Sequence, residues 1–335
     1  MQVQPSTIIS PVDPPEALNR HRLEVRLASP RGFCAGVERA IRIVEDAISA
    51  YGPPVYVRHE IVHNAHVVNR LRAMGAVFVD ELDDAPREFP TIISAHGAAS
   101  NVFDDAARRG TLLVDATCPL VLKVHNETRR RVAEGRHVVL IGHDGHPEVA
   151  GIVGQTPSGT VSIVQTVDDA AGFQLPDGAA PDNIAYVTQT TLSVDETADI
   201  IAVLTSRFPA IKGPNRADIC YATSNRQAAV KKVAPGCDMF IVVGDKASSN
   251  SNRLVETAIS AGAAKAALIP DPDEFDLAEL HGIEVIGVTS GASAPEELVE
   301  RLIARIAESS AIDLKRIAVA EENFVFRQPK LPALS

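Results

Sequence analysis

Three cysteines of this sequence occupy the same kind of local pattern, in which an apolar run is followed by a short turn and then by a helical repeat. Cys34 lies in RGFCAGVERA, Cys118 in DATCPLV and Cys220 in ICYATSNRQ. A helix N-terminus carries free backbone N–H groups and the positive end of the helix dipole, so it favours an anion such as a thiolate. If the three turns converge, their thiolates could bind zinc or an iron–sulfur cluster.

The number of cysteines at these turns narrows the choice of metal site. A structural zinc or an electron-carrying cluster generally takes four protein ligands. With three, a cubane cluster keeps one iron without a protein ligand, and that iron can act as a Lewis acid on a substrate oxygen. The fourth cysteine, Cys237, lies in PGCDMFIVVG at the start of a predicted strand. We interpret it as a small buried hydrophobic residue, the commonest role of a lone cysteine.

Polar residues follow other predicted strands, and their types suit an anionic ligand. They are His63, His96, His146, Glu148, Thr190, Ser248, Asn250 and Ser293. Ligands of open α/β sheets collect at the carboxyl ends of the strands. Imidazole, hydroxyl and amide groups offer many hydrogen-bond donors with little fixed charge, which matches the needs of a diphosphate. Two plainer interpretations stay open here, namely GHDGHPEV as a solvated loop and TQTT and SSN as helix caps.

The motif HEIVH, from His59 to His63, matches the zinc-protease pattern only if it is helical. It follows PPVYVR, in which two prolines precede β-branched residues, and a helix is predicted to begin only afterwards, near Asn64. In a strand, residues four apart lie about 13 Å from each other, too far to bind one zinc ion. The local sequence therefore argues against a zinc protease.

The elements that must position these residues form a repeated order of strand, turn and amphipathic helix. This order predicts an α/β fold with parallel or mostly parallel sheets that are covered by helices on both faces. The spacing of the cysteine turns predicts three similar α/β domains, over residues 24–117, 118–216 and 217–310, whose turns can converge if the domains are arranged around a common central cavity. Residues 1–23 are predicted to be a flexible tail, and residues 311–335 a C-terminal tail that packs back on the core. Alternation in NFVF suggests an edge strand in that tail.

Composition excludes some classes of partner and location. The chain has 335 residues, 45% of them hydrophobic, and a formal charge of −11, which argues against nucleic acid and acidic membranes as partners. It has no apolar run of 18 residues and no hydrophobic signal core near the N-terminus. We therefore expect a cytoplasmic protein, in which four widely spaced cysteines are free thiols or metal ligands.

Nine motifs together resemble the 4-hydroxy-3-methylbut-2-enyl diphosphate reductase (IspH/LytB) family, in order and over residues 24 to about 328. They are RGFCAGVERA, HEIVHN, SAHG, DATCPLV, GHDGHPEV, TQTTLSVDET, ICYATSNRQ, SSNSNRL and SGASAPEELV. The resemblance implies that Cys34, Cys118 and Cys220 hold a [4Fe-4S] cluster with one iron lacking a protein ligand. It implies Glu148 as proton donor, with Thr190 and His146 also catalytic. It implies a substrate site made of His63, His96, His146, Gln189, Thr190, Ser248, Ser249, Asn250 and Ser293.

The same resemblance implies the reaction, which is the last step of the methylerythritol phosphate route to isoprenoids. A diphosphate substrate would lose its allylic hydroxyl as water and give isopentenyl and dimethylallyl diphosphate. No nicotinamide fingerprint such as G-x-G-x-x-G is present, so we expect electrons from a separate protein, a ferredoxin or a flavodoxin. A zinc hydrolase and a noncatalytic binding protein are the alternatives, and the metal and sulfide content after anaerobic purification separates all three.

Overall fold

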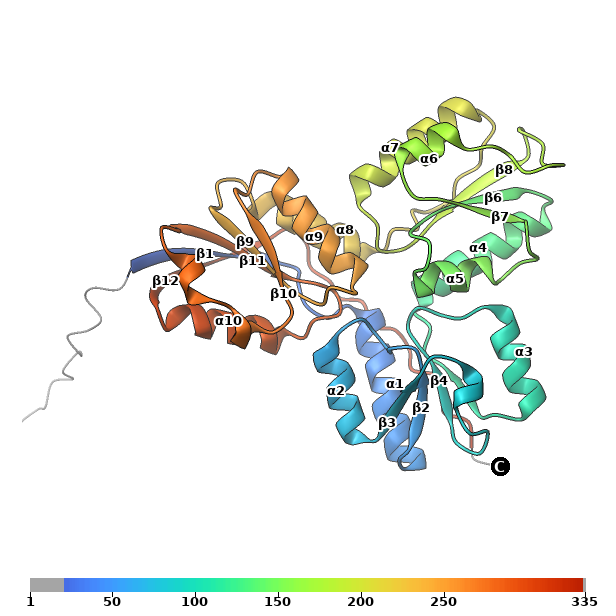
Figure 1. Cartoon of the computed structure of the whole chain (residues 1–335), viewed down its shortest axis with the longest axis horizontal. Helices are drawn as coiled ribbons and strands as arrows, with labels where there is room; N and C mark the ends of the chain where they lie inside the picture. The colour runs from blue at the N-terminus through green and yellow to red at the C-terminus, as the bar shows by residue number, and fades with distance from the viewer. Residues whose placement is uncertain (1–20, 334–335) are drawn as a thin grey trace, which may run out of the picture.

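Every strand pairing is parallel within residues 21–333, the part of the chain that this computed structural model describes. The strands form three sheets, and Figure 1 shows three lobes, one for each sheet, that meet near the middle of the molecule. The predicted α/β fold with parallel sheets is confirmed. Parallel strands need crossover connections, and helices supply most of them here.

The first sheet has the strand order β3-β2-β4-β5. Its strands are short and apolar: β2 (Val55–Arg58), β3 (Ala76–Val79), β4 (Thr91–Ile93) and β5 (Leu113–Asp115). The helices of this lobe are α1 (Ala35–Tyr51), α2 (Ala65–Met74) and α3 (Ser100–Arg109), with a 3-10 turn, η2 (Leu82–Asp84). Helix α2 ends at Gly75, whose φ of 111° places it in the left-handed conformation that favours glycine.

The second sheet has the order β7-β6-β8. It contains β6 (His137–Ile141), β7 (Val161–Val164) and β8 (Ile184–Thr188). All five residues of the central strand β6 are buried, as expected for a parallel strand that is covered on both faces. The helices are α4 (Pro119–Ala133), α5 (Pro147–Val153), α6 (Val167–Gly172) and α7 (Val194–Arg207).

The third sheet has the order β10-β9-β11-β1-β12. It contains β1 (His21–Ser29), β9 (Met239–Val243), β10 (Ala266–Ile269), β11 (Val285–Ser290) and β12 (Ser310–Ala318). Its helices are α8 (Tyr221–Val233), α9 (Ser249–Ser260) and α10 (Glu296–Ala307), with 3-10 turns η3 (Pro272–Glu274) and η4 (Leu277–Leu280).

Both ends of the described chain depart from the predicted ranges. Strand β1 falls mostly within the range 24–117 but pairs with β11 and β12 in the third sheet, because partner strands and not sequence neighbours decide where a parallel strand lies. Residues 21–23 of the predicted tail begin this strand, while residues 1–20 lie outside the described residues. The edge strand near the C-terminus is β12, and NFVF has no regular secondary structure, so that part of the prediction is wrong.

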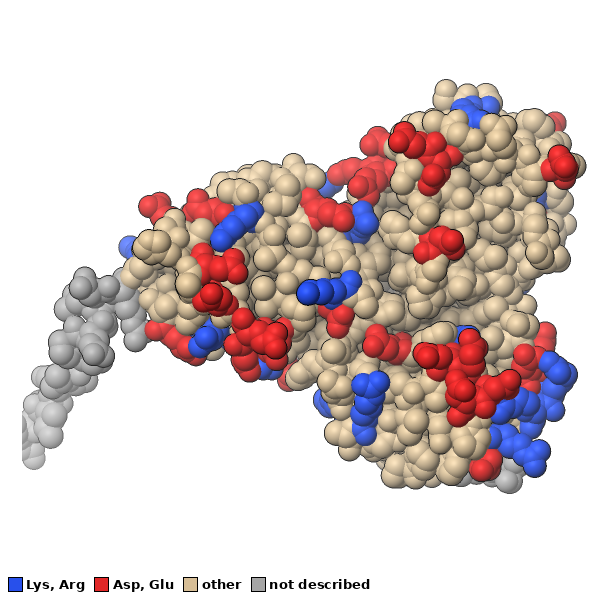
Figure 2. Space-filling model, viewed as in Figure 1, with Lys and Arg blue, Asp and Glu red and all other residues tan. Residues whose placement is uncertain are grey.

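The surface charge and the hydrophobicity of the helices can be compared with the partners expected from the sequence. Figure 2 shows acidic side chains spread over all three lobes on the face in view. None of the helices in residues 21–333 combines the length and the hydrophobicity that a membrane span requires.

Candidate active site

A cavity of about 110 Å³ lies where the three lobes meet, and it collects residues from all of them. This volume exceeds by several times what one water molecule needs. Most of the residues that the sequence singled out line it: Cys34, His63, His96, Cys118, His146, Glu148, Thr190, Cys220, Ser248, Ser249, Asn250 and Ser293.

Each of the three predicted cysteines is the N-cap of a helix. Cys34 precedes α1, Cys118 precedes α4 and Cys220 precedes α8. Proline at position 119 suits the first turn of α4 because its missing N–H would have no intrahelical partner there. The three helices therefore start at the cavity, and each brings one sulfur atom to its wall.

Gly36 shows how closely two of these sulfur atoms approach a common space. A β-carbon on Gly36 would lie 2.6 Å from Cys118 Sγ and 3.8 Å from Cys34 Sγ, so glycine leaves the gap between them open. Within residues 21–333, no three His, Cys, Asp or Glu side chains gather as ligands of a single metal ion. Three soft sulfur donors around a shared cavity fit an iron–sulfur cluster, whose metal atoms fill a volume instead of a point.

Burial changes the protonation of these thiols from the sequence-based expectation. It raises the pKa of Cys118 to about 12 and that of Cys220 to about 11, and it also raises the pKa of Cys34. Backbone N–H groups at the helix start lower the pKa of Cys34, but burial outweighs them. The expected preference for the thiolate is therefore wrong for the metal-free protein, and a metal must displace the protons when it binds.

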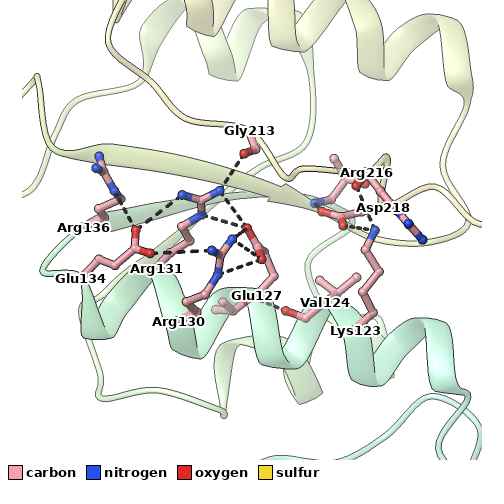
Figure 3. Close-up of polar contacts among 12 residues, drawn as sticks. Lys123, Val124, Glu127, Arg130, Arg131, Glu134, Arg136, Gly213, Arg216 and Asp218 are labelled. Carbon is pink, nitrogen blue, oxygen red and sulfur yellow. Dashed lines mark hydrogen bonds and ion pairs between the residues drawn. The ribbon is translucent and has the colours of Figure 1, made fainter.

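The segment before Cys220 contains no strand, although the repeated order of strand, turn and helix predicts one there. Instead the α4 residue Lys123 holds it, because its ammonium group donates to Arg216 O at 2.9 Å, Ala217 O at 2.7 Å and Asp218 Oδ1 at 3.0 Å, as Figure 3 shows. The other oxygen of Asp218 accepts from Thr188 N at 3.1 Å.

Further along α4, Arg131 donates to Gly213 O at 2.8 Å (Figure 3). Gly213 is required there, since a β-carbon would lie 2.4 Å from the hydroxyl of Tyr186. Helix α4 thus carries Cys118 at its start and anchors the irregular segment that positions Cys220.

Three histidines from different loops form a cluster on the cavity wall. The ring centroids of His63 and His96 lie 4.3 Å apart, and His146 lies 5.6 Å and 5.8 Å from them. Burial lowers the pKa of His146 to about 4 and lowers that of His96 well below its usual value. At neutral pH these two rings are uncharged, so each ring offers one N–H donor and one acceptor.

The HEIVH motif does not form a helix, as predicted. Strand β2 ends at Arg58, and the loop that follows gives His59 a φ of 59°. His63 lines the central cavity, whereas His59 lines a separate cleft of about 390 Å³ beside Glu81. The two histidines therefore face different spaces.

Glu148 is a buried carboxyl group at the start of α5. The residue is only 2% exposed to solvent. Its carboxylate accepts two hydrogen bonds from Thr190, one from the backbone N to Oε1 at 2.7 Å and one from Oγ1 to Oε2 at 3.0 Å. Burial raises its pKa to about 7, the two bonds from Thr190 oppose that shift, and the charge of Asp218 adds to it. Glu148 can therefore hold a proton near neutral pH, which an ordinary glutamate cannot do.

The remaining polar residues differ in how their hydrogen bonds are used. Asn250 is 4% exposed, and its side-chain nitrogen and oxygen both lack a partner within residues 21–333. Ser293 Oγ donates to His63 O at 3.0 Å, and Ser248 Oγ accepts from Ser251 N at 3.3 Å. Unpaired buried amide atoms cost free energy, so Asn250 is the residue whose surroundings most clearly require a polar ligand.

Two of the residues predicted to bind substrate use their side-chain polar atoms in hydrogen bonds to neighbouring loops. Ser249 lines the cavity but donates its hydroxyl to Thr191 O at 3.2 Å. Gln189 is fully buried and does not line the cavity. Its Oε1 accepts from His143 N at 3.1 Å and its Nε2 donates to Thr191 Oγ1 at 3.1 Å, so it braces two loops beside the site.

Sequence reasoning missed several residues that touch this site, and three of them have side chains of particular interest. Thr223 N and Oγ1 lie 3.4 Å and 3.1 Å from Cys220 Sγ, and the position three residues after the N-cap was the available signal. Tyr221 and Phe326 also line the cavity. Tyr221 adjoins Cys220, but nothing in the local pattern of Phe326 indicates that its segment returns to the site.

These features define an α/β protein of three parallel-sheet lobes around a thiol-lined central cavity. The family model described as LytB protein matches residues 25–307, and the chain belongs to this family. Two relatives, from Hyphomonas neptunium and Phenylobacterium zucineum, are named 4-hydroxy-3-methylbut-2-enyl diphosphate reductase. They are 53% and 55% identical to this chain, over 93% of it and 98% of each relative.

Solved structures agree with the family. The E-1-hydroxy-2-methyl-but-2-enyl-4-diphosphate reductase of Plasmodium falciparum is 36% identical, with a TM-score of 0.84 over 94% of this chain and 96% of that chain. A second structure, of an (E)-4-hydroxy-3-methyl-but-2-enyl diphosphate reductase described as the terminal enzyme of the non-mevalonate pathway, is 30% identical. Its TM-score is 0.60 over 85% of this chain and 99% of that chain.

Proposed function

We propose that this chain is a reductase that converts (E)-4-hydroxy-3-methylbut-2-enyl diphosphate to isopentenyl and dimethylallyl diphosphate, the last step of the methylerythritol phosphate pathway. The observation that carries the proposal is a single cavity, in a member of the LytB family, that joins three cysteine thiols, a histidine cluster and a buried Glu148. This combination supplies sites for a metal cluster, for an anion and for a proton.

Cys34, Cys118 and Cys220 would hold a [4Fe-4S] cluster in which one iron has no protein ligand. When bound, this group supplies electrons and a Lewis-acid position for a substrate oxygen. The donor set and the open space at Gly36 support the assignment. Thr223 supports Cys220 by its two contacts to Sγ.

The diphosphate would bind the polar donors that line the same cavity: His63, His96, His146, Ser248, Ser249, Asn250 and Ser293. The unpaired amide of Asn250 gains partners when the anion binds. The low pKa values of His96 and His146 mean that both rings are neutral in the empty site, and a bound anion raises their proton affinity. Neither ring therefore adds positive charge to the site before the anion binds.

Glu148 would hold the proton that leaves with the substrate hydroxyl. Thr190 keeps both carboxyl oxygens in place and, with His146, completes the catalytic group. The overall reaction consumes two electrons and two protons: the C–O bond breaks, one proton leaves with the oxygen as water, and one adds to the allylic carbon skeleton. Protonation at either end of the allylic system gives the two isomeric products.

Two electrons per turnover have to come from outside, and we assign them to a ferredoxin or a flavodoxin. The absence of a G-x-G-x-x-G fingerprint from the sequence supports a protein donor over a bound nicotinamide. A reducing, cytoplasmic location suits three free thiols that must remain available to a cluster.

Anaerobic purification followed by an assay with reduced methyl viologen tests this function. We expect a brown protein with iron and acid-labile sulfide that forms both isomeric diphosphates. A colourless zinc protein would point to a hydrolase, and a metal-free protein that binds the diphosphate unchanged would point to a binding protein; either result contradicts the proposal.

A further inference from the structure

The segment 319–333, which we name the C-terminal strap, leaves the third sheet after β12 and crosses to the first lobe. Figure 1 shows this dark red segment passing behind α1 toward the side of β4. It has no regular secondary structure but is tied along its length. Arg39 Nε donates to Arg327 O at 3.0 Å, and the Tyr51 hydroxyl donates to Pro332 O at 2.6 Å.

A buried arginine fixes the strap to the cysteine turns. The Arg226 guanidinium is fully buried and lies 3.1 Å from both carboxylate oxygens of Glu322 in the strap. The same guanidinium donates to Gly32 O at 2.7 Å, two residues before Cys34. Because Arg226 belongs to α8, one side chain joins the strap, the turn of Cys34 and the helix of Cys220.

The middle of the strap forms part of the cavity wall and is also exposed to solvent. Phe326 lines the cavity, whereas Phe324 is 54% exposed and Val325 is 89% exposed. Single exposed apolar residues are ordinary on protein surfaces. Here two adjacent ones lie on the outer side of the wall whose inner side faces the thiols.

An aromatic stack connects this exposed apex to two of the cysteines. The ring of Phe324 stacks on Tyr221 with a centroid distance of 4.1 Å and an interplanar angle of 29°. Tyr221 directly follows Cys220, and its hydroxyl oxygen accepts from Ala35 N, the residue after Cys34, at 3.3 Å. The stack is therefore a short contact path from solvent to the thiols.

The strap carries two carboxylates before its apex, Glu321 and Glu322, and Glu322 is paired with the buried Arg226. The part of the strap from residue 323 onward differs in charge from the chain as a whole. Residues 323–333 contain Arg327 and Lys330 and no carboxylate, while the chain carries a formal charge of −11. Arg39, bound to the strap, adds a third cationic side chain. Local positive charge on an acidic protein attracts and orients an acidic partner.

We propose that the apex of the strap, Phe324 and Val325, is the surface on which an acidic one-electron carrier protein docks and passes electrons inward along the Phe324–Tyr221 stack. The proposal rests on the proposed function. In each docking event the reduced carrier is oxidised by one electron and the site gains that electron, so two events serve one turnover. Docking here places the carrier's redox centre one aromatic stack away from the thiols.

The test compares Val325→Glu with Ile259→Glu, a matched control that places the same charge on an exposed apolar residue of α9. The probe is a plant-type [2Fe–2S] ferredoxin. Iron content, the rate of single-electron reduction and the sedimentation coefficient are recorded for each variant, beside three main quantities measured on the cluster-loaded enzyme. They are ferredoxin affinity by calorimetry, turnover driven by reduced ferredoxin, and turnover driven by methyl viologen, which is small enough not to need a docking surface.

We expect Val325→Glu to weaken ferredoxin affinity at least tenfold and to slow ferredoxin-driven turnover, with viologen-driven turnover and iron content unchanged. Ile259→Glu should change none of these. Phe324→Leu should keep the affinity within about twofold but slow the single-electron reduction at saturating ferredoxin, because it removes the ring and keeps an apolar contact.

The proposal is overturned if Val325→Glu binds ferredoxin as tightly as the unaltered protein, or if the unaltered protein does not bind it. It is also overturned if Val325→Glu changes only the sedimentation coefficient, because a second copy of the chain would then cover the apex. Failure of the proposed function is recognised separately, as absence of viologen-driven turnover in the unaltered protein.

Discussion

Two residues that flank strand β9, Cys237 before it and Asn250 after it, are buried to a similar degree but have opposite chemical surroundings. Before β9, Cys237 is 2% exposed, lies in a hydrophobic cluster and has its thiol paired with Val233 O at 3.2 Å. After β9, Asn250 is equally inaccessible, but its two polar atoms have no partner in the described part of the chain. Burial is common to both ends, whereas unsatisfied polarity belongs only to the end that faces the cavity.

The thiols make the same comparison. Burial raises the pKa of Cys237 to about 11, the value reached by Cys220. A perturbed pKa alone therefore does not separate a core cysteine from a candidate ligand. What separates them is position, because Cys220 opens a helix at the cavity and Cys237 fills a gap between a helix and a strand.

Serine substitution of the four cysteines gives the largest expected contrast. Cys34→Ser, Cys118→Ser and Cys220→Ser should each lose the cluster or nearly all activity, because an oxygen donor replaces a soft thiolate. Cys237→Ser should keep both, with a stability cost of at most about 1–3 kcal/mol for a hydroxyl in an apolar site. Anaerobic iron counts on the four variants check this. If Cys237→Ser lost as much iron as the other three variants, the distinction between a core cysteine and the three candidate ligands would be wrong.

Glu148→Gln gives the next largest effect and tests whether the buried carboxyl is a proton donor. It keeps the shape of the side chain but cannot supply a proton, so turnover should fall by about 10²–10⁴ while substrate affinity changes little. Asp144→Asn is the control, since this exposed aspartate lies in the same loop and its carboxylate accepts only from Gly145 N among the hydrogen bonds of the described residues. Near-normal turnover of Glu148→Gln beside a crippled Asp144→Asn would exclude the assignment.

The pH dependence of the same variant sharpens the assignment. The pKa of Glu148 is raised to about 7 by burial, so its acid form is populated below that pH and lost above it. A bound diphosphate adds negative charge and raises this pKa further. The ratio kcat/KM of the unaltered enzyme, which reports the free enzyme, should therefore fall as pH rises above about 7, and kcat should fall only at a higher pH. Glu148→Gln should lack both falls.

The smallest effects are expected for Asn250→Ala and Asn183→Ala. The first should change diphosphate affinity and the second the free energy of unfolding. Hydrogen bonds to a charged group contribute roughly 1.5–3 kcal/mol, so Asn250→Ala should weaken diphosphate affinity about ten- to a hundredfold without lowering the free energy of unfolding. Asn183, just before β8, donates to Gly135 O at 2.7 Å. Its alanine variant should lose about 0.5–1.5 kcal/mol of stability and no affinity. Anaerobic calorimetry and denaturant unfolding measure both, and a reversed pattern would contradict the assignment of Asn250.

Local patterns in the sequence were enough to predict much of this molecule. Helix starts at Cys34, Cys118 and Cys220 follow from residue periodicity and from proline at position 119, and the non-helical HEIVH follows from the prolines before it. Parallel sheets follow from the alternation of strands and helices. These features depend on interactions between residues that are only a few positions apart, so the local sequence is sufficient to predict them.

Other features required the tertiary structure. Strand β1 joins the third sheet, Phe326 returns to the cavity, and Gln189 turns away from it. The pKa of Glu148 and the protonation of the cysteine thiols depend on burial by segments far away in the sequence. Each of these outcomes depends on which distant surfaces exclude water from a group, and the local pattern around that group contains no information about them.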